Sequence, residues 1–170
     1  MGISERLRSW DEIAENISQG DLNFDRTQKV ADIYRDHRRH LAKEWLDLNS
    51  YIKHRYLKYP YSMKIVSEVD DSGNIEEYEK KYVSPDAEYR GKRIVMADNE
   101  FPYAFSPEIS HKVIWSVEDL CAEDYRQFVN RDYPEEDYDI MVFVNPVHLK
   151  SVRGVHHGHA LIRRNGAWKE

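Results

Sequence analysis

The sequence contains a single cysteine, Cys121, among its 170 residues. An internal disulfide is therefore excluded, and so is a zinc site built from several cysteines, which makes a reducing compartment the natural setting. Long hydrophobic runs are also missing, because no stretch approaches the roughly 20 apolar residues of a membrane-spanning helix. The opening residues, MGISERLRSW, lack the apolar segment of a secretion signal. The sequence thus predicts a cytoplasmic protein with no membrane partner.

A net positive charge is absent as well, since 31 acidic residues outnumber 25 basic ones and the formal net charge is −6. Nucleic acids and anionic membranes are normally bound by basic surfaces, so neither is expected as a partner. The stretch RDHRRH at residues 35–40 is interpreted as the solvated side of a helix, with nucleic-acid contact as the alternative. Residues 146–170 are locally basic, with five basic residues and one acidic residue. This segment suits a small anionic ligand.

Aromatic residues, in contrast, are abundant, with 4 Trp, 12 Tyr and 5 Phe in a sequence that is 41% hydrophobic. Such a content predicts a folded chain with a buried core rather than a disordered one. The length suits a single domain over residues 1–170, in which residues 1–60 are helical and residues 61–170 form the sheet part.

Capping residues and apolar spacing indicate two N-terminal helices. Ser9 followed by Glu12 is a capping box, which predicts a short helix that ends at Gly20. Apolar residues then recur at helical spacing over about residues 25–56. This pattern predicts one long amphipathic helix, which Pro60 ends.

The remainder of the chain has the pattern of a sheet. A hairpin is predicted over about residues 63–83. Further strands are expected at residues 93–97, 111–117, 140–144 and 155–163, and a helix over residues 118–131 is expected to pack on them. The predicted fold class is therefore α+β, with a mainly antiparallel sheet, one packed helix and N-terminal helices.

Four of the eight histidines gather in FVNPVHLKSVRGVHHGHALIRR, residues 143–164. Side chains alternate along a strand, so His157, His159 and Arg163 should share one face, while His156 and Gly158 share the other. A row of two imidazoles and a guanidinium could handle a phosphate or hold a metal. The plainest alternative is that these histidines are hydrogen-bonded fillers of a half-exposed strand.

The chain as a whole resembles a largely fungal family named after the N-acetylglucosamine-induced protein. Three signposts carry the resemblance in order: SWDEI at residues 9–13, NEFPYAFSPEISHKVIW at residues 99–115 and LKSVRGVHHGHALIR at residues 149–163. The name implies little about chemistry, because induction by a sugar tells when a protein is made and not what it does.

Residues 93–164 are also similar to the histidine-triad superfamily of nucleotide hydrolases and transferases. The shared order of elements runs through RIVMADNEFPYAF, HKVIW, VEDLCAEDYRQFV, IMVFVN, KSV and HGHALIR. The resemblance implies a histidine-triad-like sheet in which His157 takes the nucleophile's place and His159 the final triad place. Val155 stands where the first triad histidine belongs, and Lys150 stands near the usual glutamine.

Phosphoryl or nucleotidyl transfer through histidine needs a neutral imidazole aimed at phosphorus, donors for the phosphate oxygens and a proton source for the leaving group. His157 would attack, Ser151 and Arg163 would donate, and His159 or His156 would handle protons. The predicted function is a histidine-dependent phosphoesterase or nucleotidyl transferase that acts on a small nucleotide or nucleotide-sugar. The alternative is a non-catalytic module that binds a nucleotide or sugar phosphate.

Three other sets of residues leave further alternatives open. His111 opens a neighbouring strand and could join His157 and His159 as three nitrogen ligands of a divalent metal; no other cofactor is expected. Asn145 could orient a phosphate or ribose, or it could simply form a turn before the following proline. The aromatic residues of NEFPY and Trp115 could stack on a base or sugar, although such residues are more often part of a core.

Overall fold

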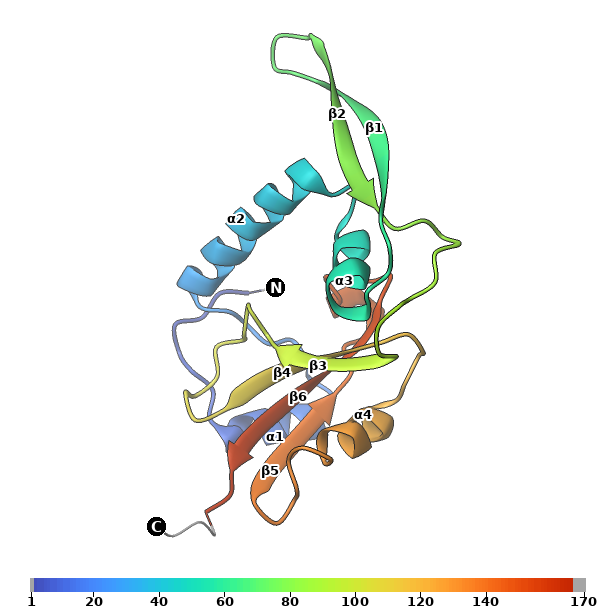
Figure 1. Ribbon diagram of the computed structural model, residues 1–170. Coiled ribbons are helices and arrows are strands. Elements are labelled where there is room, and N and C mark those ends of the chain that lie inside the picture. The colour runs from blue at the N-terminus through green and yellow to red at the C-terminus, as the bar shows by residue number, and fades with distance from the viewer. Residues whose placement is uncertain (1, 167–170) are drawn as a thin grey trace.

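The structure is a computed structural model that describes residues 2–166 of the chain. At its centre lies a four-stranded antiparallel sheet with the strand order β3-β4-β6-β5 (Figure 1). The strands are β3 (Ile94–Asp98), β4 (Ser110–Ser116), β5 (Tyr138–Phe143) and β6 (His156–Arg164). Helices cover both faces of this sheet, so the fold class is α+β, as the sequence predicts.

The helix α4 (Ala122–Val129) covers one face of the sheet, within the range in which a helix was predicted. Its Tyr125 ring lies directly against Gly158, where an added Cβ would come within 2.6 Å of the ring. The Tyr125 hydroxyl is 2.6 Å from the Ser116 hydroxyl on β4. Glycine is therefore needed at residue 158 to let the ring reach this hydrogen bond, on the face opposite to His157.

The helix α1 (Trp10–Ser18) covers the far end of the other face. Its predicted capping box is confirmed, because the Glu12 amide donates to the Ser9 hydroxyl at 3.3 Å and the Ser9 amide donates to the Glu12 carboxylate at 2.8 Å. Trp10 and Ile13 are buried in a cluster that includes Leu161 of β6. The capped helix thus closes the sheet beyond the histidines.

The prediction of one long helix over residues 25–56 is wrong, because two helices, α2 (Gln28–Glu44) and α3 (Leu48–Leu57), occupy this range. Trp45 takes an extended conformation, with φ −115° and ψ 140°, and the next amide, of Leu46, donates to the Lys81 carbonyl at 2.9 Å. Asp47 then caps α3 by accepting from the Ser50 amide at 2.7 Å. Within residues 2–166, no helix is long and apolar enough to cross a membrane.

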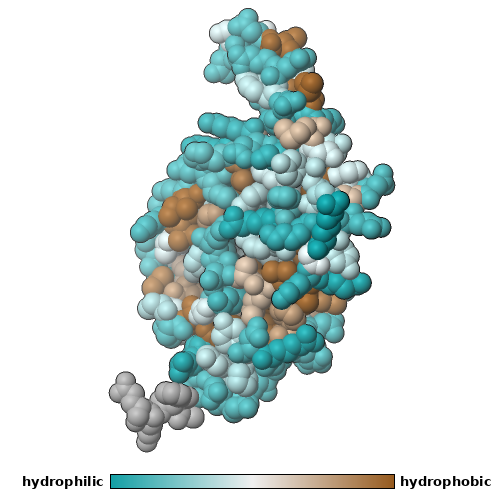
Figure 2. All heavy atoms as spheres, in the orientation of Figure 1, coloured by the Kyte–Doolittle hydropathy of each residue, from teal (hydrophilic) through white to brown (hydrophobic). Residues whose placement is uncertain are grey.

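The predicted hairpin is confirmed as a separate two-stranded sheet, β1 (Ser62–Val69) and β2 (Ile75–Tyr82). It projects from the rest of the chain beyond α3 (Figure 1). Hydrophobic side chains lie on its outside (Figure 2), and Ile65, Val69 and Ile75 are 62%, 69% and 73% exposed. The hairpin therefore contributes little to the core, which lies around the four-stranded sheet.

Candidate functional site

A cavity lies between α2, α3 and the sheet face that carries His157 and His159. It holds about 740 Å³ of space that no atom fills, its open mouth included. Its aromatic walls are Tyr34, Tyr51, Tyr56, Phe101, Tyr103 and Trp115. Its polar lining includes Arg26, His37, Asn145, Ser151, His157 and His159. Two carboxylates also line it, and both are paired, Asp98 with Lys112 and Glu100 with Arg55. The site thus combines flat apolar surfaces with nitrogen donors and a permanent cation.

His157 is buried on β6, opposite Trp115 of β4, and the two ring centroids are 4.9 Å apart. Its Nδ1 lies 2.9 Å from the Val155 carbonyl oxygen. A carbonyl can only accept a hydrogen bond, so Nδ1 carries the hydrogen of the neutral ring and Nε2 carries the lone pair. Burial lowers the pKa of His157, which keeps the ring neutral near pH 7. Nε2 is therefore available as a nucleophile.

His159 and His111 form a second imidazole unit behind His157. The Nδ1 of His159 is 2.9 Å from the Nε2 of His111, and the Tyr103 amide donates to the Nδ1 of His111 at 3.4 Å. Burial lowers the pKa of His111 to about 3, and burial together with the neighbouring His111 lowers the pKa of His159 well below its usual range. Both rings are thus neutral near pH 7.

The Tyr103 amide sets the direction of hydrogen bonding through this unit. Because His111 accepts at Nδ1, its hydrogen lies at Nε2 and is donated to the Nδ1 of His159, whose own hydrogen then lies at Nε2. That atom is 3.2 Å from an amide terminus of Asn145, which is also 3.1 Å from the Tyr103 hydroxyl. The same terminus can accept from both groups if it is the amide oxygen. The other terminus of this buried amide has no hydrogen-bond partner.

Arg26 supplies the permanent positive charge of the cavity. It is only 7% exposed, and its Nε donates to the Phe101 carbonyl at 2.8 Å. Its guanidinium carbon lies 4.9 Å from the ring centroid of Tyr34 and 5.3 Å from that of Tyr103. Burial lowers the pKa of Arg26, but a guanidinium stays protonated in proteins. A ligand with a negative charge would therefore be favoured here.

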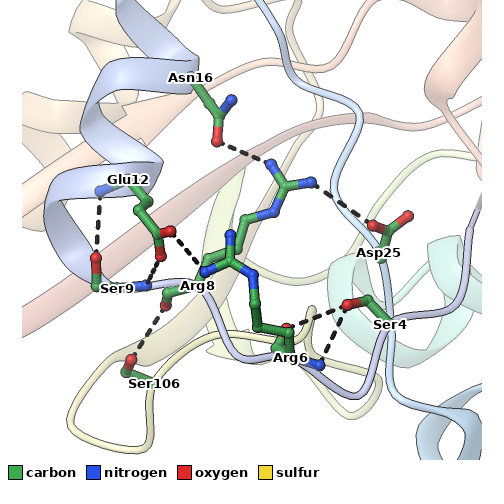
Figure 3. Close-up of polar contacts among 8 residues, drawn as sticks. All are labelled: Ser4, Arg6, Arg8, Ser9, Glu12, Asn16, Asp25 and Ser106. Atoms are coloured by element: carbon green, nitrogen blue, oxygen red, sulfur yellow. Dashed lines mark hydrogen bonds and ion pairs between the residues drawn. The ribbon is translucent and has the colours of Figure 1, made fainter.

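A polar network next to α1 fixes the segment that carries Arg26 (Figure 3). Arg8 donates to the Asn16 side chain at 2.8 Å and lies 3.6 Å from the Asp25 carboxylate. The Ser106 hydroxyl donates to the Arg8 carbonyl at 3.1 Å, and the Ala104 amide donates to the Asp25 carbonyl at 2.8 Å. Residues far apart in the sequence thus hold Arg26 in the cavity.

The structure brings together four of the predicted site residues, because Asn145, Ser151, His157 and His159 all line the cavity. His111 supports this group from behind through its hydrogen bond to His159.

His156 and Arg163 are not brought to the cavity. His156 is exposed on the opposite face of β6, where its Nδ1 is 3.4 Å from the Asp119 carboxylate. Arg163 shares the face of His157, as predicted, but it lies four residues further along the strand than His159. There its Nε is 2.8 Å from the Asp139 carboxylate and its guanidinium lies over Trp10, 4.5 Å from the ring centroid.

The predicted metal ligands do not converge. His111 and His159 point ring nitrogens at each other across a hydrogen bond, so they cannot direct those lone pairs at one ion together with His157. Among residues 2–166, no group of three or more His, Cys, Asp or Glu side chains is arranged to hold a metal ion.

The helices α2 and α3 and the segment before α2 add cavity residues that the sequence did not reveal, namely Arg26, Tyr34, Tyr51 and Tyr56. These residues look like ordinary members of amphipathic helices or turns, and their role depends on where α2 and α3 pack. Trp115 was predicted near the histidines and does line the cavity, where it also stacks on Tyr56 with ring centroids 5.4 Å apart.

Fold and site together define an α+β protein in which a histidine strand faces an aromatic cavity closed by N-terminal helices. The chain belongs to the family described as "Protein of unknown function (DUF3605)", whose model matches residues 9–163. It is 26% identical over 170 residues to Uncharacterized protein YPL067C of Saccharomyces cerevisiae, an alignment that covers 90% of this chain and 77% of the yeast protein. A crystal structure of HTC1 has the same fold, with a TM-score of 0.60 and 22% identity over 94% of this chain and 89% of that one.

Proposed function

We propose that the chain is a histidine-dependent phosphoesterase or nucleotidyl transferase, and that it acts on a small nucleotide or nucleotide-sugar bound in the cavity. The observation that carries this proposal is the state of His157, a buried neutral imidazole whose Nδ1 is held by the Val155 carbonyl. His157 also lines the cavity that contains the buried cation Arg26. In this proposal His157 is the nucleophile and Arg26 is the charge that binds the phosphate.

In the proposed reaction, the Nε2 lone pair of His157 attacks phosphorus. A phosphorus–nitrogen bond forms while the bond from phosphorus to the leaving oxygen breaks, and the leaving oxygen takes up a proton from water at the open mouth of the cavity. The Nδ1 hydrogen remains bonded to the Val155 carbonyl, which stabilises the positive charge that the ring acquires. Arg26 and Ser151 would bind the phosphate oxygens. His159 was the predicted proton-handling residue, but its two ring nitrogens bond to His111 and Asn145, so it would position Asn145. Water then cleaves the phosphorus–nitrogen bond and restores the neutral ring.

The aromatic walls support a ligand with a flat or sugar-like part. Tyr56 stacked on Trp115 and the ring of Phe101 offer apolar faces around the cavity. Bases and sugars bind such faces through stacking and apolar contact. A ligand that joins a planar group to a phosphate would use both kinds of surface.

Trapping the covalent intermediate tests the proposal. The protein is incubated with ATP or a UDP-sugar labelled at the α-phosphorus and quenched in base, and label is expected on His157. His157→Ala should lose both labelling and turnover, because the covalent path itself is removed. His156→Ala is the matched control, since it changes the adjacent histidine on the opposite face and should keep the label. Labelling that survives in His157→Ala would refute the mechanism.

A binding module without turnover is the second candidate. Val155, in the first triad place, is buried in the apolar cluster with Ile52 and Leu57 of α3, so this position serves packing and not proton transfer. If a nucleotide raises the melting temperature of the protein but no label or turnover is found, the binding module is the correct function. A ligand at a hundred times its dissociation constant stabilises by about 2.7 kcal/mol, which makes the shift measurable.

The setting of this activity is also a proposal. Cys121 is exposed and unpaired, which fits a reducing compartment such as the cytoplasm.

A further inference from the structure

A groove on the outside of α2 continues the cavity beyond Tyr34. The two hollows share Arg26, Tyr34 and Ser151 in their walls. Two further arginines, Arg35 and Arg38, line the groove but not the cavity. The walls of the groove therefore include three guanidinium groups, of which Arg26 also lines the cavity.

Tyr34 lies in the walls of both hollows, beside two of the arginines. The guanidinium carbon of Arg26 lies 4.9 Å from its ring centroid, and that of Arg38 lies 5.8 Å from it. The two cations are therefore separated by no more than the sum of these two distances. Arg38 also donates to the Tyr34 hydroxyl at 3.0 Å, which holds its guanidinium group beside the Tyr34 ring.

Arg35 and Arg38 can still donate hydrogen bonds to a ligand. Arg35 is paired with Asp32 at 3.0 Å, but its side chain is 54% exposed and that of Asp32 is 49% exposed. Exposed pairs of this kind contribute about 0–1 kcal/mol, so an incoming phosphate can compete with the carboxylate. A guanidinium carries five N–H donors, which leaves several on each arginine for phosphate oxygens.

We propose that this groove is a second anion subsite, and that the ligand therefore carries a chain of at least two phosphate groups. The proposal rests on the proposed function only in placing the first phosphate beside His157. A second phosphate would then extend past Ser151 and Tyr34 towards Arg38 and Arg35. A ligand with one phosphate would leave this subsite unused.

Calorimetric titration with inorganic triphosphate and with orthophosphate, at one fixed ionic strength, tests the subsite. The wild type should bind triphosphate at least about tenfold more tightly. Arg38→Gln and Arg35→Gln should each weaken triphosphate binding by about tenfold and leave orthophosphate binding nearly unchanged. Arg39→Gln is the matched control, because Arg39 lies on the same helix, pairs with Asp36 and does not line the groove.

Equal affinity for the two anions would overturn the proposal, and so would an equal loss in Arg39→Gln, which would indicate general attraction to the helix. His157→Ala separates this inference from the proposed function, since it should keep the preference for triphosphate while it loses labelling. If the wild type prefers triphosphate but is never labelled, the subsite is supported and only the proposed reaction is refuted. If the wild type is labelled but neither Arg35→Gln nor Arg38→Gln weakens triphosphate binding, the subsite is refuted and the proposed reaction stands.

Discussion

The buried pair of His111 and His159 should make the protein sensitive to mild acid. The pKa of His111 is lowered to about 3 by burial and by Arg26, whereas an unfolded histidine titrates near 6.5. Between these values the unfolded chain binds a proton that the folded chain does not, so stability falls as the pH drops below about 6.5. At pH 5 the difference for His111 alone is about 2 kcal/mol. Above the unfolded pKa both states are neutral and the effect vanishes.

Urea unfolding at pH 7.5 and pH 5 measures this loss directly. Arg26, Tyr103 and His159 are the titratable groups that face His111. His111→Asn should therefore lose about 2 kcal/mol less than the wild type between the two pH values, whatever its stability at pH 7.5. His148→Gln is the control, because this side chain is exposed and its replacement leaves the buried pair of His111 and His159 intact. An equal loss in His111→Asn and wild type would refute the reasoning.

Two further predictions concern packing and capping. Gly158→Ala would bring a methyl group within 2.6 Å of the buried Tyr125 ring and should lower the free energy of unfolding in urea by about 1–3 kcal/mol, whereas Gly166→Ala, with no atom within 4 Å of the added group, should not. Equal stability of Gly158→Ala and wild type would contradict the described packing of α4. Asp47→Ala should cost about 1 kcal/mol because the Ser50 amide loses its acceptor, and Asp47→Asn should retain most of the stability. If thermal melting shows no difference between these two variants, Asp47 does not hold the start of α3.

The sequence by itself determined the elements whose signals are local. Ser9 and Glu12 are three residues apart, so their capping box needs no information from elsewhere in the chain. The alternation in β6 likewise follows from strand geometry, which is why His157 and His159 were placed on one face and Gly158 on the other. The antiparallel sheet and its packed helix followed from the spacing of apolar runs.

Only the tertiary structure decided where the chain turns after α2 and what surrounds the histidines. The apolar pattern continues through Trp45, and the helix ends there because the next amide binds Lys81 of the hairpin, a partner 35 positions away in the sequence. Arg163 has the right spacing for an anion site, yet Asp139 and Trp10 hold it at the other end of the sheet. The cation in the cavity is Arg26, which packing of the N-terminal segment brings beside Phe101. Contacts between distant segments depend on three-dimensional packing, and no local pattern in the sequence encodes them.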